Sequence, residues 1–458
     1  MPPSIHRQSA DAPWHGTPPS WVSPCPGGTI HCSFHTRLKR FSNKTQTLQW
    51  LDRRVGVPVC FFLTIVRRII AWFAGAAAGA PYRSVLFIKL AEQGSTVLAY
   101  DAIQGAVERV GRDQVYFLVF EENRFVLDVL GLIPPQNVFT VRTGSAWAMI
   151  ASCAGCLAEI RRRRIDACVD LEFFARFAAA IAYLTGARRR VGFHAFLGGG
   201  PYRGDLFTHR VLYNPHLHTK AAFASLVQAL EADPQRLPTM DQTPPPPRPL
   251  PPFAPGPEER AEMRRLLTEL GIPADARLVL MNANASDLLP LRRWDERNYV
   301  LLVRRLLEQI PGLWVAFTGS PTEAPPIGRL VQEIGSPRCV CLAGRTTLRQ
   351  LLVVYGLAEV LVTNDSGPAH FAALTSIDAV TLFGPETPLL FAAPGPRSHP
   401  VWTGLACSPC VSAYNNRQTA CRDNVCMQKI TVDQVFDLVC QIYQQRSDLT
   451  PGTPITTA

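Results

Sequence analysis

The stretch from Val360 to Pro388 holds the residue types of an anion-binding site. Its first residues, 360–363, predict a buried strand, and Asn364-Asp365-Ser366-Gly367-Pro368 predicts a sharp turn into a helix over 369–375. A helix N-terminus offers an anion free backbone N–H groups and the positive end of the helix dipole. Gly367 would let a phosphate approach because glycine has no Cβ. The stretch therefore predicts half of a nucleotide-diphosphate site.

A second strand and turn follow at once. Residues 380–383 are apolar or β-branched, and Gly384 and Pro385 come next. Open parallel sheets bind their ligands at the carboxyl ends of the strands, where the following loops gather. We therefore expect the Gly384 turn to lie on the same sheet edge as the turn around Asp365.

Strand and helix patterns alternate along most of the chain, and this alternation predicts an α/β fold with two doubly wound, Rossmann-like domains. Helical stretches, notably 295–309 and 347–357, lie between the strand-like runs. Those runs are 85–90, 115–120, 138–141, 166–171, 277–282, 313–319, 339–344, 359–363 and 379–384.

A proline-dense segment divides the two halves, because it cannot sustain a helix or a central strand. Two domains joined by this stiff linker would face each other across a cleft between the carboxyl edges of their sheets. The predicted organisation is a disordered extension at 1–48, an apolar and basic segment at 49–81, a first domain at 82–233, the linker at 234–257, a second domain at 258–445 with a Cys-rich loop at 405–427, and a flexible tail at 446–458.

The composition is that of a folded, basic protein. Of 458 residues, 47% are hydrophobic and 18% are charged, so burial can offset the entropy of ordering the chain, and the formal net charge is +10. A basic balance suits nucleic acid, an anionic membrane face or a phosphorylated substrate. The basic runs at 161–164 and 188–190 lack interleaved aromatics, which favours a solvated face or anionic lipid, and no nucleic acid partner is expected. The N-terminus has no recognisable signal peptide, which predicts a cytoplasmic location.

The segment 55–80 is apolar but is interrupted by Arg67 and Arg68. Neither apolar half reaches the roughly 18–20 residues that span a bilayer, and two arginines at mid-membrane would be costly. An interfacial membrane helix and a helix packed on the first domain both remain open. Lipid head groups would contact Arg53, Arg54, Arg67 and Arg68. The membrane is preferred because the aromatics exceed what one helix face can bury: Phe61, Phe62, Trp72 and Phe73.

From about Ser84 to Gln445 the chain resembles glycosyltransferase family 9, the ADP-heptose:lipopolysaccharide heptosyltransferases. The most specific marker is Asp365-Ser366-Gly367-Pro368-x-His370 followed by Leu382-Phe383-Gly384-Pro385-x-Thr387-Pro388, which is similar to the family's donor-site signature. Supporting matches are Arg-Arg-Trp at 292–294 and Thr318-Gly319-Ser320 with Glu323. The resemblance implies the two-domain GT-B architecture, with the acceptor on the first domain and a nucleotide-sugar donor on the second. It also implies an inverting, metal-independent transfer that requires no cofactor.

The resemblance implies roles for the donor-side residues. Arg292 stands where the family has a basic residue that contacts phosphate, and its guanidinium fork suits phosphate oxygens. Glu323 would accept hydrogen bonds from ribose hydroxyls, the alternative being a solvated helix-start carboxylate. Asp365 would touch donor hydroxyls while capping the helix, and His370 would face the anion or be an ordinary first-turn residue. The full donor-binding set is Arg292, Glu323, Asp365, Ser366, Gly367, Pro368, His370 and Gly384.

The acceptor loop departs from the family pattern. Family members usually carry Gly-Asp after the first strand, with that Asp proposed as general base, whereas this chain has Ser95 in its place. An unassisted serine cannot take a proton at neutral pH. Glu92, three residues earlier, is the predicted replacement base, and Asp101 is the less favoured one. Lys89, at the end of the strand, either faces an acceptor phosphate or is simply solvated.

Four cysteines form a separate cluster with the spacing C-x2-C-x10-C-x4-C. This spacing permits a structural four-thiolate zinc site, and it equally permits a reduced or disulfide-capable loop beside the active cleft, which is the interpretation we prefer. The cysteines are Cys407, Cys410, Cys421 and Cys426.

The favoured function is transfer of a sugar, with ADP-heptose as the expected donor, to a lipopolysaccharide-core or other lipid-linked acceptor. The enzyme would be peripheral on the cytoplasmic face of the bacterial inner membrane, with 55–80 on the membrane surface. Two alternatives remain: a family 9 transferase that uses another nucleotide sugar, and a catalytically silent nucleotide-sugar-binding protein, which Ser95 keeps open. A dehydrogenase is disfavoured because the first strand and loop lack Gly-x-Gly-x-x-Gly.

Overall fold

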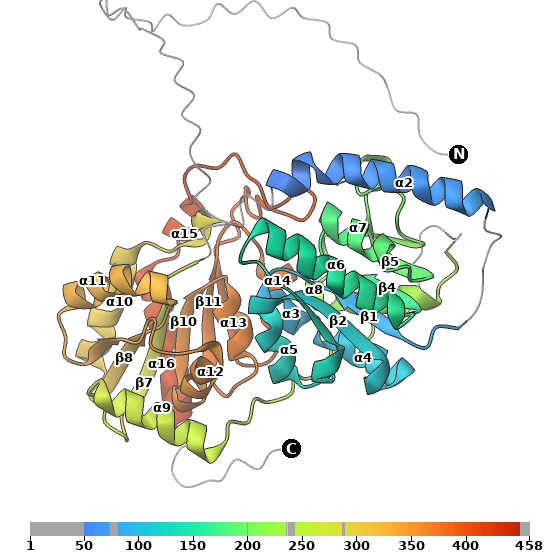
Figure 1. Ribbon diagram of the computed structural model, residues 1–458. Coiled ribbons are helices and arrows are strands. Elements are labelled where there is room, and N and C mark those ends of the chain that lie inside the picture. Colours follow the sequence, from blue (N-terminus) through green and yellow to red (C-terminus); the bar gives the residue numbers. More distant parts are fainter. Residues whose placement is uncertain are drawn as a thin grey trace, which may run out of the picture. The chain divides into compact units, whose positions relative to one another are not determined.

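The computed structural model describes residues 50–73, 81–198, 200–234, 236, 243–285 and 289–448. The predicted extension at 1–48 lies outside these residues, and so does most of the predicted tail. The described chain forms two six-stranded sheets whose strands all pair in parallel (Figure 1).

The first sheet has the strand order β3-β2-β1-β4-β5-β6. Its strands are β1 (Val85–Ile88), β2 (Val115–Phe120), β3 (Val138–Val141), β4 (Ala167–Asp170), β5 (Arg189–His194) and β6 (His209–Leu212). The helices of this half are α2 (Gly56–Phe73), α3 (Gln93–Leu98), α4 (Tyr100–Val110), α5 (Arg124–Leu130), α6 (Ala146–Arg162), α7 (Arg176–Leu184) and α8 (Thr219–Gln228).

The second sheet repeats this order as β12-β11-β10-β7-β8-β9. Its strands are β7 (Arg277–Asn282), β8 (Leu313–Phe317), β9 (Cys339–Cys341), β10 (Val360–Asn364), β11 (Asp378–Phe383) and β12 (Ser398–Trp402). Its helices are α9 (Pro257–Glu269), α10 (Glu296–Gln309), α11 (Ala324–Ile334), α12 (Leu348–Leu357), α13 (Gly367–Ala372), α14 (Pro388–Phe391), α15 (Val425–Gln428) and α16 (Val432–Asp448). The prediction of two doubly wound Rossmann-like domains is confirmed.

The central strands β1, β4 and β10 are buried at every position, as expected of parallel strands covered on both faces. In β1, Val85 and Phe87 belong to one hydrophobic cluster, and Leu86 and Ile88 belong to another. In β10, neighbouring residues likewise point into different clusters. Each fully buried aliphatic or aromatic side chain contributes about 1.5–3 kcal/mol, so these runs fix the strands whose ends carry the predicted loops.

Three strands were missed by the sequence patterns: β5, β6 and β12. β5 begins with Arg189 and Arg190, which the pattern placed in a solvated basic run. Arg190 instead donates its Nε to the Leu206 carbonyl at 2.8 Å. β6 and β12 are edge strands with polar residues and without a continuous apolar run, so they give little hydrophobic signal.

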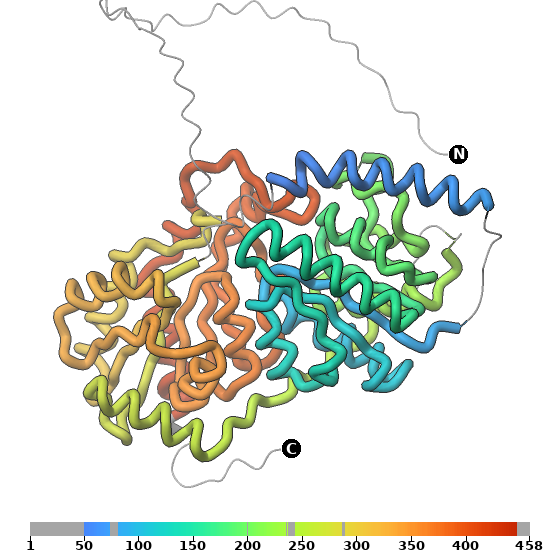
Figure 2. The backbone as a smooth tube through the Cα atoms, viewed as in Figure 1, coloured from blue at the N-terminus to red at the C-terminus, as the bar shows by residue number. Residues whose placement is uncertain are grey.

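The predicted linker has neither helix nor strand over its described residues 243–256, and α9 begins at Pro257. Figure 2 follows this segment from the green first half of the chain into the yellow-green α9. Its backbone is held on the second domain, because the N–H of Phe253 donates to the carbonyl of Leu374 at 2.6 Å.

Helix α2 packs one face on the first domain, over α7 (Figure 1). Gly56, Cys60 and Thr64, each one turn apart, are its buried residues. The Thr64 hydroxyl accepts a hydrogen bond from the backbone N–H of Asp205 at 2.9 Å, and Arg67 forms an ion pair with the same Asp205. The alternative of a helix packed on the first domain is therefore confirmed. We had expected Arg67 to contact lipid head groups, but it pairs with Asp205 instead.

The opposite face of α2 is exposed and strongly apolar. By length and composition alone, α2 is the one helix among the described residues that could cross a membrane, but only 17% of it is buried in the protein. Its exposed large side chains are Val57, Phe61, Phe62, Ile65, Ile69, Ile70, Trp72 and Phe73.

Candidate active site

Both predicted loops lie where the strand order of their sheet reverses. In the first sheet the reversal falls between β1 and β4, and in the second between β7 and β10. Loops that follow such neighbouring strands turn to opposite sides and leave room for a ligand. The loop around Glu92 follows β1 and the turn around Asp365 follows β10, so the topology alone makes both of them candidate half-sites.

Glu92 and Ser95 contact each other in the acceptor loop. The Ser95 hydroxyl donates to the backbone carbonyl of Glu92 at 2.8 Å and lies 3.4 Å from its carboxylate Oε2. Glu92 has φ 66°, the left-handed region that favours glycine, and such strained residues cluster at functional sites. Asp101 is tied elsewhere, because its carboxylate lies 3.3 Å from the Nζ of buried Lys220.

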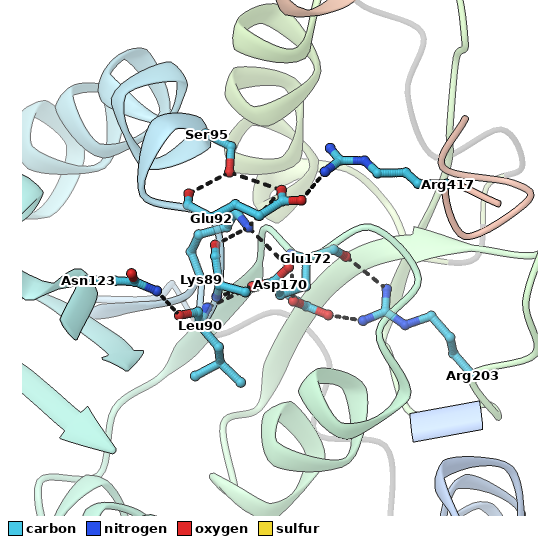
Figure 3. A network of polar contacts seen from close by, with 10 residues as sticks. Lys89, Leu90, Glu92, Ser95, Asn123, Asp170, Glu172, Arg203 and Arg417 are labelled. Carbon is cyan, nitrogen blue, oxygen red and sulfur yellow. Dashed lines mark hydrogen bonds and ion pairs between the residues drawn. The ribbon is translucent and has the colours of Figure 1, made fainter. Parts of the chain in front are cut away.

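Lys89 supports this loop and does not face an acceptor. Its side chain is fully buried, and its Nζ donates to Glu172 Oε2 at 3.1 Å and to the Ala91 carbonyl at 2.6 Å. The other Glu172 oxygen accepts the backbone N–H groups of Leu90 (2.7 Å) and Ala91 (2.9 Å). Figure 3 shows this network directly beneath Glu92. Both expectations for Lys89, an acceptor phosphate and a solvated ammonium, are therefore wrong, because a buried carboxylate already pairs with it.

The donor turn is built around Asn364 and Arg292. The Asn364 amide donates to the Ala283 carbonyl at 3.0 Å and accepts the Trp294 N–H at 3.0 Å, so it joins β10 to the segments after β7. Arg292 then donates to the Asp365 carbonyl at 3.1 Å, with its guanidinium 3.7 Å from the Asp365 carboxylate. Sequence reasoning missed Asn364, whose signal was a polar amide at the end of an apolar strand.

Helix α13 begins at Gly367, with Pro368 in its first turn, and is shorter than predicted. It has six residues, and its N-cap residue is Ser366, not Asp365, so the capping role expected for Asp365 is wrong. The Ser366 hydroxyl donates to the Asn364 carbonyl at 3.1 Å instead of capping the helix. So short a helix has a weak dipole, so an anion here would depend largely on side-chain cations.

Several buried polar atoms around this turn have no hydrogen-bond partner among the described residues. They are Arg292 Nε, Asp365 Oδ2, His370 Nδ1 and Glu386 Oε1. Asp365 is 4% exposed and Glu386 is 3% exposed. An unpaired buried polar group costs about 1–3 kcal/mol, and such groups call for an explanation such as a ligand. The cluster therefore indicates a polar ligand at the carboxyl end of β10.

Burial governs protonation in this cluster. It raises the pKa of Glu386 to about 7, a rise that the Arg292 guanidinium opposes and the Asp365 carboxylate reinforces. It raises the pKa of Asp365 as well, and it lowers the pKa of His370 to about 4, so that imidazole is neutral at pH 7. Burial works against the charge of Arg292, but the Glu386 and Asp365 carboxylates raise its pKa overall. Arg292 is thus a fixed cation beside carboxylates of which Glu386 can exchange a proton near neutral pH.

Arg417 joins the two half-sites. It belongs to the segment 403–424, which has no helix or strand, and its guanidinium forms an ion pair with the Glu92 carboxylate (Figure 3). Its Nε lies 3.4 Å from Glu386 Oε1. Burial lowers the pKa of Arg417 to about 10, so it remains charged at pH 7. No sequence pattern marks Arg417 or Glu386, because Arg417 lies in an irregular loop and Glu386 occupies the unspecified position after Leu-Phe-Gly-Pro.

Helices α3 and α13 also contact each other across the two half-sites. A Cβ on Gly94 would lie 2.5 Å from His370 Cδ2 and 3.2 Å from Gly367 Cα. Gly94 therefore permits an approach that no larger residue would allow without displacement. The edges of the two sheets, expected to face each other across a cleft, are here in direct contact through these residues and through Arg417.

Two predicted donor residues have structural partners. Glu323 Oε2 accepts the backbone N–H of Ser320 at 2.7 Å in a capping box, which matches the helix-start alternative. A Cβ on Gly384 would lie 2.4 Å from Met427 Sδ, so the packing of α15 requires a glycine here, and its donor-binding role stays a prediction.

The four clustered cysteines are all free thiols, with Cys426 buried and Cys407 exposed. Among the described residues, no group of three or more His, Cys, Asp or Glu side chains is placed to hold a metal ion. The zinc site and the metal-free loop both stay predictions.

Comparison with known proteins points to one family. A model of glycosyltransferase family 9 (heptosyltransferase) matches residues 159–420, more than half of the chain. Lipooligosaccharide heptosyltransferase 2 of Haemophilus influenzae is 34% identical over 102 residues, and lipopolysaccharide heptosyltransferase 2 of Escherichia coli is 30% identical over 102 residues. Each match covers 22% of this chain and only 29% of the curated relative. The family match includes the donor turn and begins after the acceptor loop.

Solved structures share the fold over most of the chain. The E. coli ADP-heptose LPS heptosyltransferase II superposes with a TM-score of 0.59 at 16% identity, covering 80% of this chain and 99% of that one. The E. coli heptosyltransferase WaaC with ADP gives a TM-score of 0.55 at 17% identity, covering 78% and 99%. These likenesses confirm the predicted GT-B architecture.

Proposed function

The chain belongs to glycosyltransferase family 9, and we propose that it transfers a heptose from ADP-heptose to a lipopolysaccharide-core or other lipid-linked acceptor, with inversion at the anomeric carbon. The observation that carries the proposal is the direct contact between the two half-sites. Unpartnered buried polar atoms at the donor turn lie against a loop that presents the Glu92 carboxylate and the Ser95 hydroxyl.

On the donor side, Arg292 and the backbone N–H groups of Ser366 and Gly367 would receive the diphosphate. Charge builds up on the diphosphate as the sugar leaves, so donors already aimed at its oxygens lower the barrier. Asp365 Oδ2 and His370 Nδ1, which have no hydrogen-bond partner among the described residues, would bind hydroxyls of the donor. Glu323 would bind the ribose with the carboxylate oxygen that does not cap its helix.

On the acceptor side, Glu92 acts as the general base. Its carboxylate takes the proton of the acceptor hydroxyl, the hydroxyl oxygen bonds to the anomeric carbon, and the bond from that carbon to the diphosphate breaks. Attack from the face opposite the diphosphate inverts the anomeric centre. Ser95, whose hydroxyl lies 3.4 Å from the Glu92 carboxylate, orients the base.

The exposed face of α2 would hold the enzyme on the cytoplasmic face of the inner membrane, close to a lipid-linked acceptor. Phe61, Phe62, Trp72 and Phe73 are 59–87% exposed on a helix that the domain already holds by its other face. A helix fixed in this way can insert its aromatic side chains at the depth of the head groups while lying flat.

Purified protein with nucleotide sugars tests the proposal. We expect ADP-heptose to raise the melting temperature, since a ligand stabilises by RT ln(1 + [L]/Kd), and we expect transfer to a heptose-deficient lipopolysaccharide core. Glu92→Gln should abolish transfer while the donor still stabilises the protein. Stabilisation by a different nucleotide sugar would change the sugar assignment. Binding without turnover on any acceptor core would favour the silent binding protein, and full turnover of Glu92→Gln would remove Glu92 from the mechanism.

A further inference from the structure

Two guanidinium groups from distant parts of the chain converge on one carboxylate oxygen. Glu386 Oε1 lies 3.9 Å from Arg292 Nη2 and 3.4 Å from Arg417 Nε. Despite these two neighbours it forms no hydrogen bond with any described residue, and neither does Arg292 Nε. The two cations are therefore gathered around an oxygen that neither of them holds in hydrogen-bond geometry.

We propose that Arg292 and Arg417 form a two-guanidinium clamp for a diphosphate, and that the Glu386 carboxylate occupies the clamp until the diphosphate displaces it. Guanidinium forks match the geometry of phosphate oxygens and form strong charge-assisted hydrogen bonds with them. A carboxylate oxygen between them is the chemical stand-in for a phosphate oxygen. The inference rests on the proposed function, which supplies the nucleoside diphosphate.

The charges at the site show why Glu386 must respond. Glu386 is faced by Arg292, Asp365 and Arg417, and by the phenol of Tyr213, whose pKa burial and Glu386 raise to about 12. With Asp365 and Glu386 both ionised, these two and Glu92 already place three carboxylates against the two guanidiniums before a diphosphate arrives. A diphosphate would repel these carboxylates, and burial already favours the neutral form of Glu386. Binding should therefore be accompanied by uptake of a proton at Glu386.

The clamp would also release the proposed base. Arg417 holds the Glu92 carboxylate in the structure, and the same guanidinium would turn toward the diphosphate. Its loop is suited to such a change because 403–424 lacks regular secondary structure. Donor binding would then free Glu92 Oε1 for the acceptor hydroxyl, while Lys89 Nζ stays 3.7 Å from Oε2. The base would thus become available only when a donor is present.

Isothermal titration with ADP, inorganic pyrophosphate and adenosine tests the clamp. Because Arg417→Met removes a charge-assisted contact, we expect it to weaken the affinity for ADP and for pyrophosphate by about tenfold or more. The affinity for adenosine should not change. Arg417→Lys should fall between, because it keeps the charge without the fork. Arg422→Met is the matched control, an exposed arginine of the same loop whose guanidinium donates to the Cys421 carbonyl. Wild-type affinity for ADP and pyrophosphate in Arg417→Met would overturn the proposal.

Glu386→Gln tests the clamp from the other side and does not depend on the folding of an Arg417 variant. We expect it to bind ADP and pyrophosphate several-fold more tightly than wild type at pH 8, and to lose proton uptake when binding heats are compared in buffers of different ionisation enthalpy. Unchanged affinity together with unchanged proton uptake would refute the role of Glu386. If the wild-type protein binds neither ADP nor pyrophosphate, the donor assignment and the clamp both fail. If the wild type binds both and the variants bind them with the same affinity, only the clamp is refuted.

Discussion

Lys89→Met should destabilise the first domain and displace the acceptor loop. The substitution keeps an apolar stem of similar length and removes the ammonium that pairs with Glu172. Removing one partner of a buried ion pair costs about 3–5 kcal/mol because the other charge is left uncompensated. Glu172 keeps the N–H groups of Leu90 and Ala91, so we expect a loss near the lower end, about 3 kcal/mol.

Urea unfolding followed by tryptophan fluorescence and far-UV circular dichroism would measure this loss. Lys429→Met, at an exposed lysine of the second domain, is the control and should change the unfolding free energy little. Adding Glu172→Gln to Lys89→Met should recover part of the loss, because the neutral amide oxygen still accepts the two N–H groups and leaves no buried charge. Transfer activity should fall with Lys89→Met, since Glu92 stands on the same loop.

A loss below about 1 kcal/mol for Lys89→Met, the range of exposed ion pairs, would refute this reasoning. So would a double variant that is less stable than the single one. Either result would mean that the ion pair between Lys89 and Glu172 does not hold the acceptor loop, which contains Glu92, in position.

Three further predictions follow from the site and from α2. Gly94→Ala should cost about 1–3 kcal/mol by overpacking, because its Cβ would meet His370 Cδ2 at 2.5 Å; a melting temperature equal to wild type would contradict this. Burial raises the pKa of Glu386 from 4.5 in the unfolded chain to about 7 in the folded protein, so its ionisation destabilises the native state. The unfolding free energy of wild type should therefore fall by about 3 kcal/mol relative to Glu386→Gln as the pH rises from 4.5 to 7, and no further above pH 7. A stability difference in urea unfolding that does not vary with pH would refute the burial argument. Phe61→Ser with Phe62→Ser should abolish flotation with anionic vesicles without lowering the melting temperature, whereas unchanged flotation would remove α2 from membrane binding.

The fold was predictable where a buried strand is a continuous run of apolar residues. β1 and β10 are apolar at nearly every position because helices cover both faces of the sheet, so their sequences predict buried strands directly. β5 was not predictable in this way, because Arg189 and Arg190 at its start satisfy their guanidinium groups with backbone carbonyls, a long-range arrangement that leaves no periodicity.

The site was predictable to the extent that it is local in sequence. The resemblance to the family's acceptor-loop pattern nominated Ser95 and its neighbour Glu92, and Asp365 directly follows a buried strand in the turn that matches the donor-site signature. The contacts that complete the site are not local. Arg417 lies 325 residues from Glu92, its partner, and no propensity or motif in an irregular loop encodes a pairing over that distance.

The pairing of Arg417 with Glu92 bears on the departure of this chain from its family at the acceptor loop. Both Glu92 oxygens face protein groups, because Arg417 pairs with Oε1 while the Ser95 hydroxyl and Lys89 Nζ lie 3.4 and 3.7 Å from Oε2. We therefore expect Glu92 to replace the loop aspartate only after Arg417 has left it. Glu92 can act as the base only if another anion pairs with Arg417 in its place. A diphosphate bound between Arg292 and Arg417, where Glu386 now lies, would be such an anion. If both proposals hold, Glu92→Gln and Arg417→Met should impair different steps, the first abolishing transfer with ADP binding intact and the second weakening ADP binding itself. Equal loss of ADP binding in both variants would show that Glu92 and Arg417 serve only to hold the two domains together.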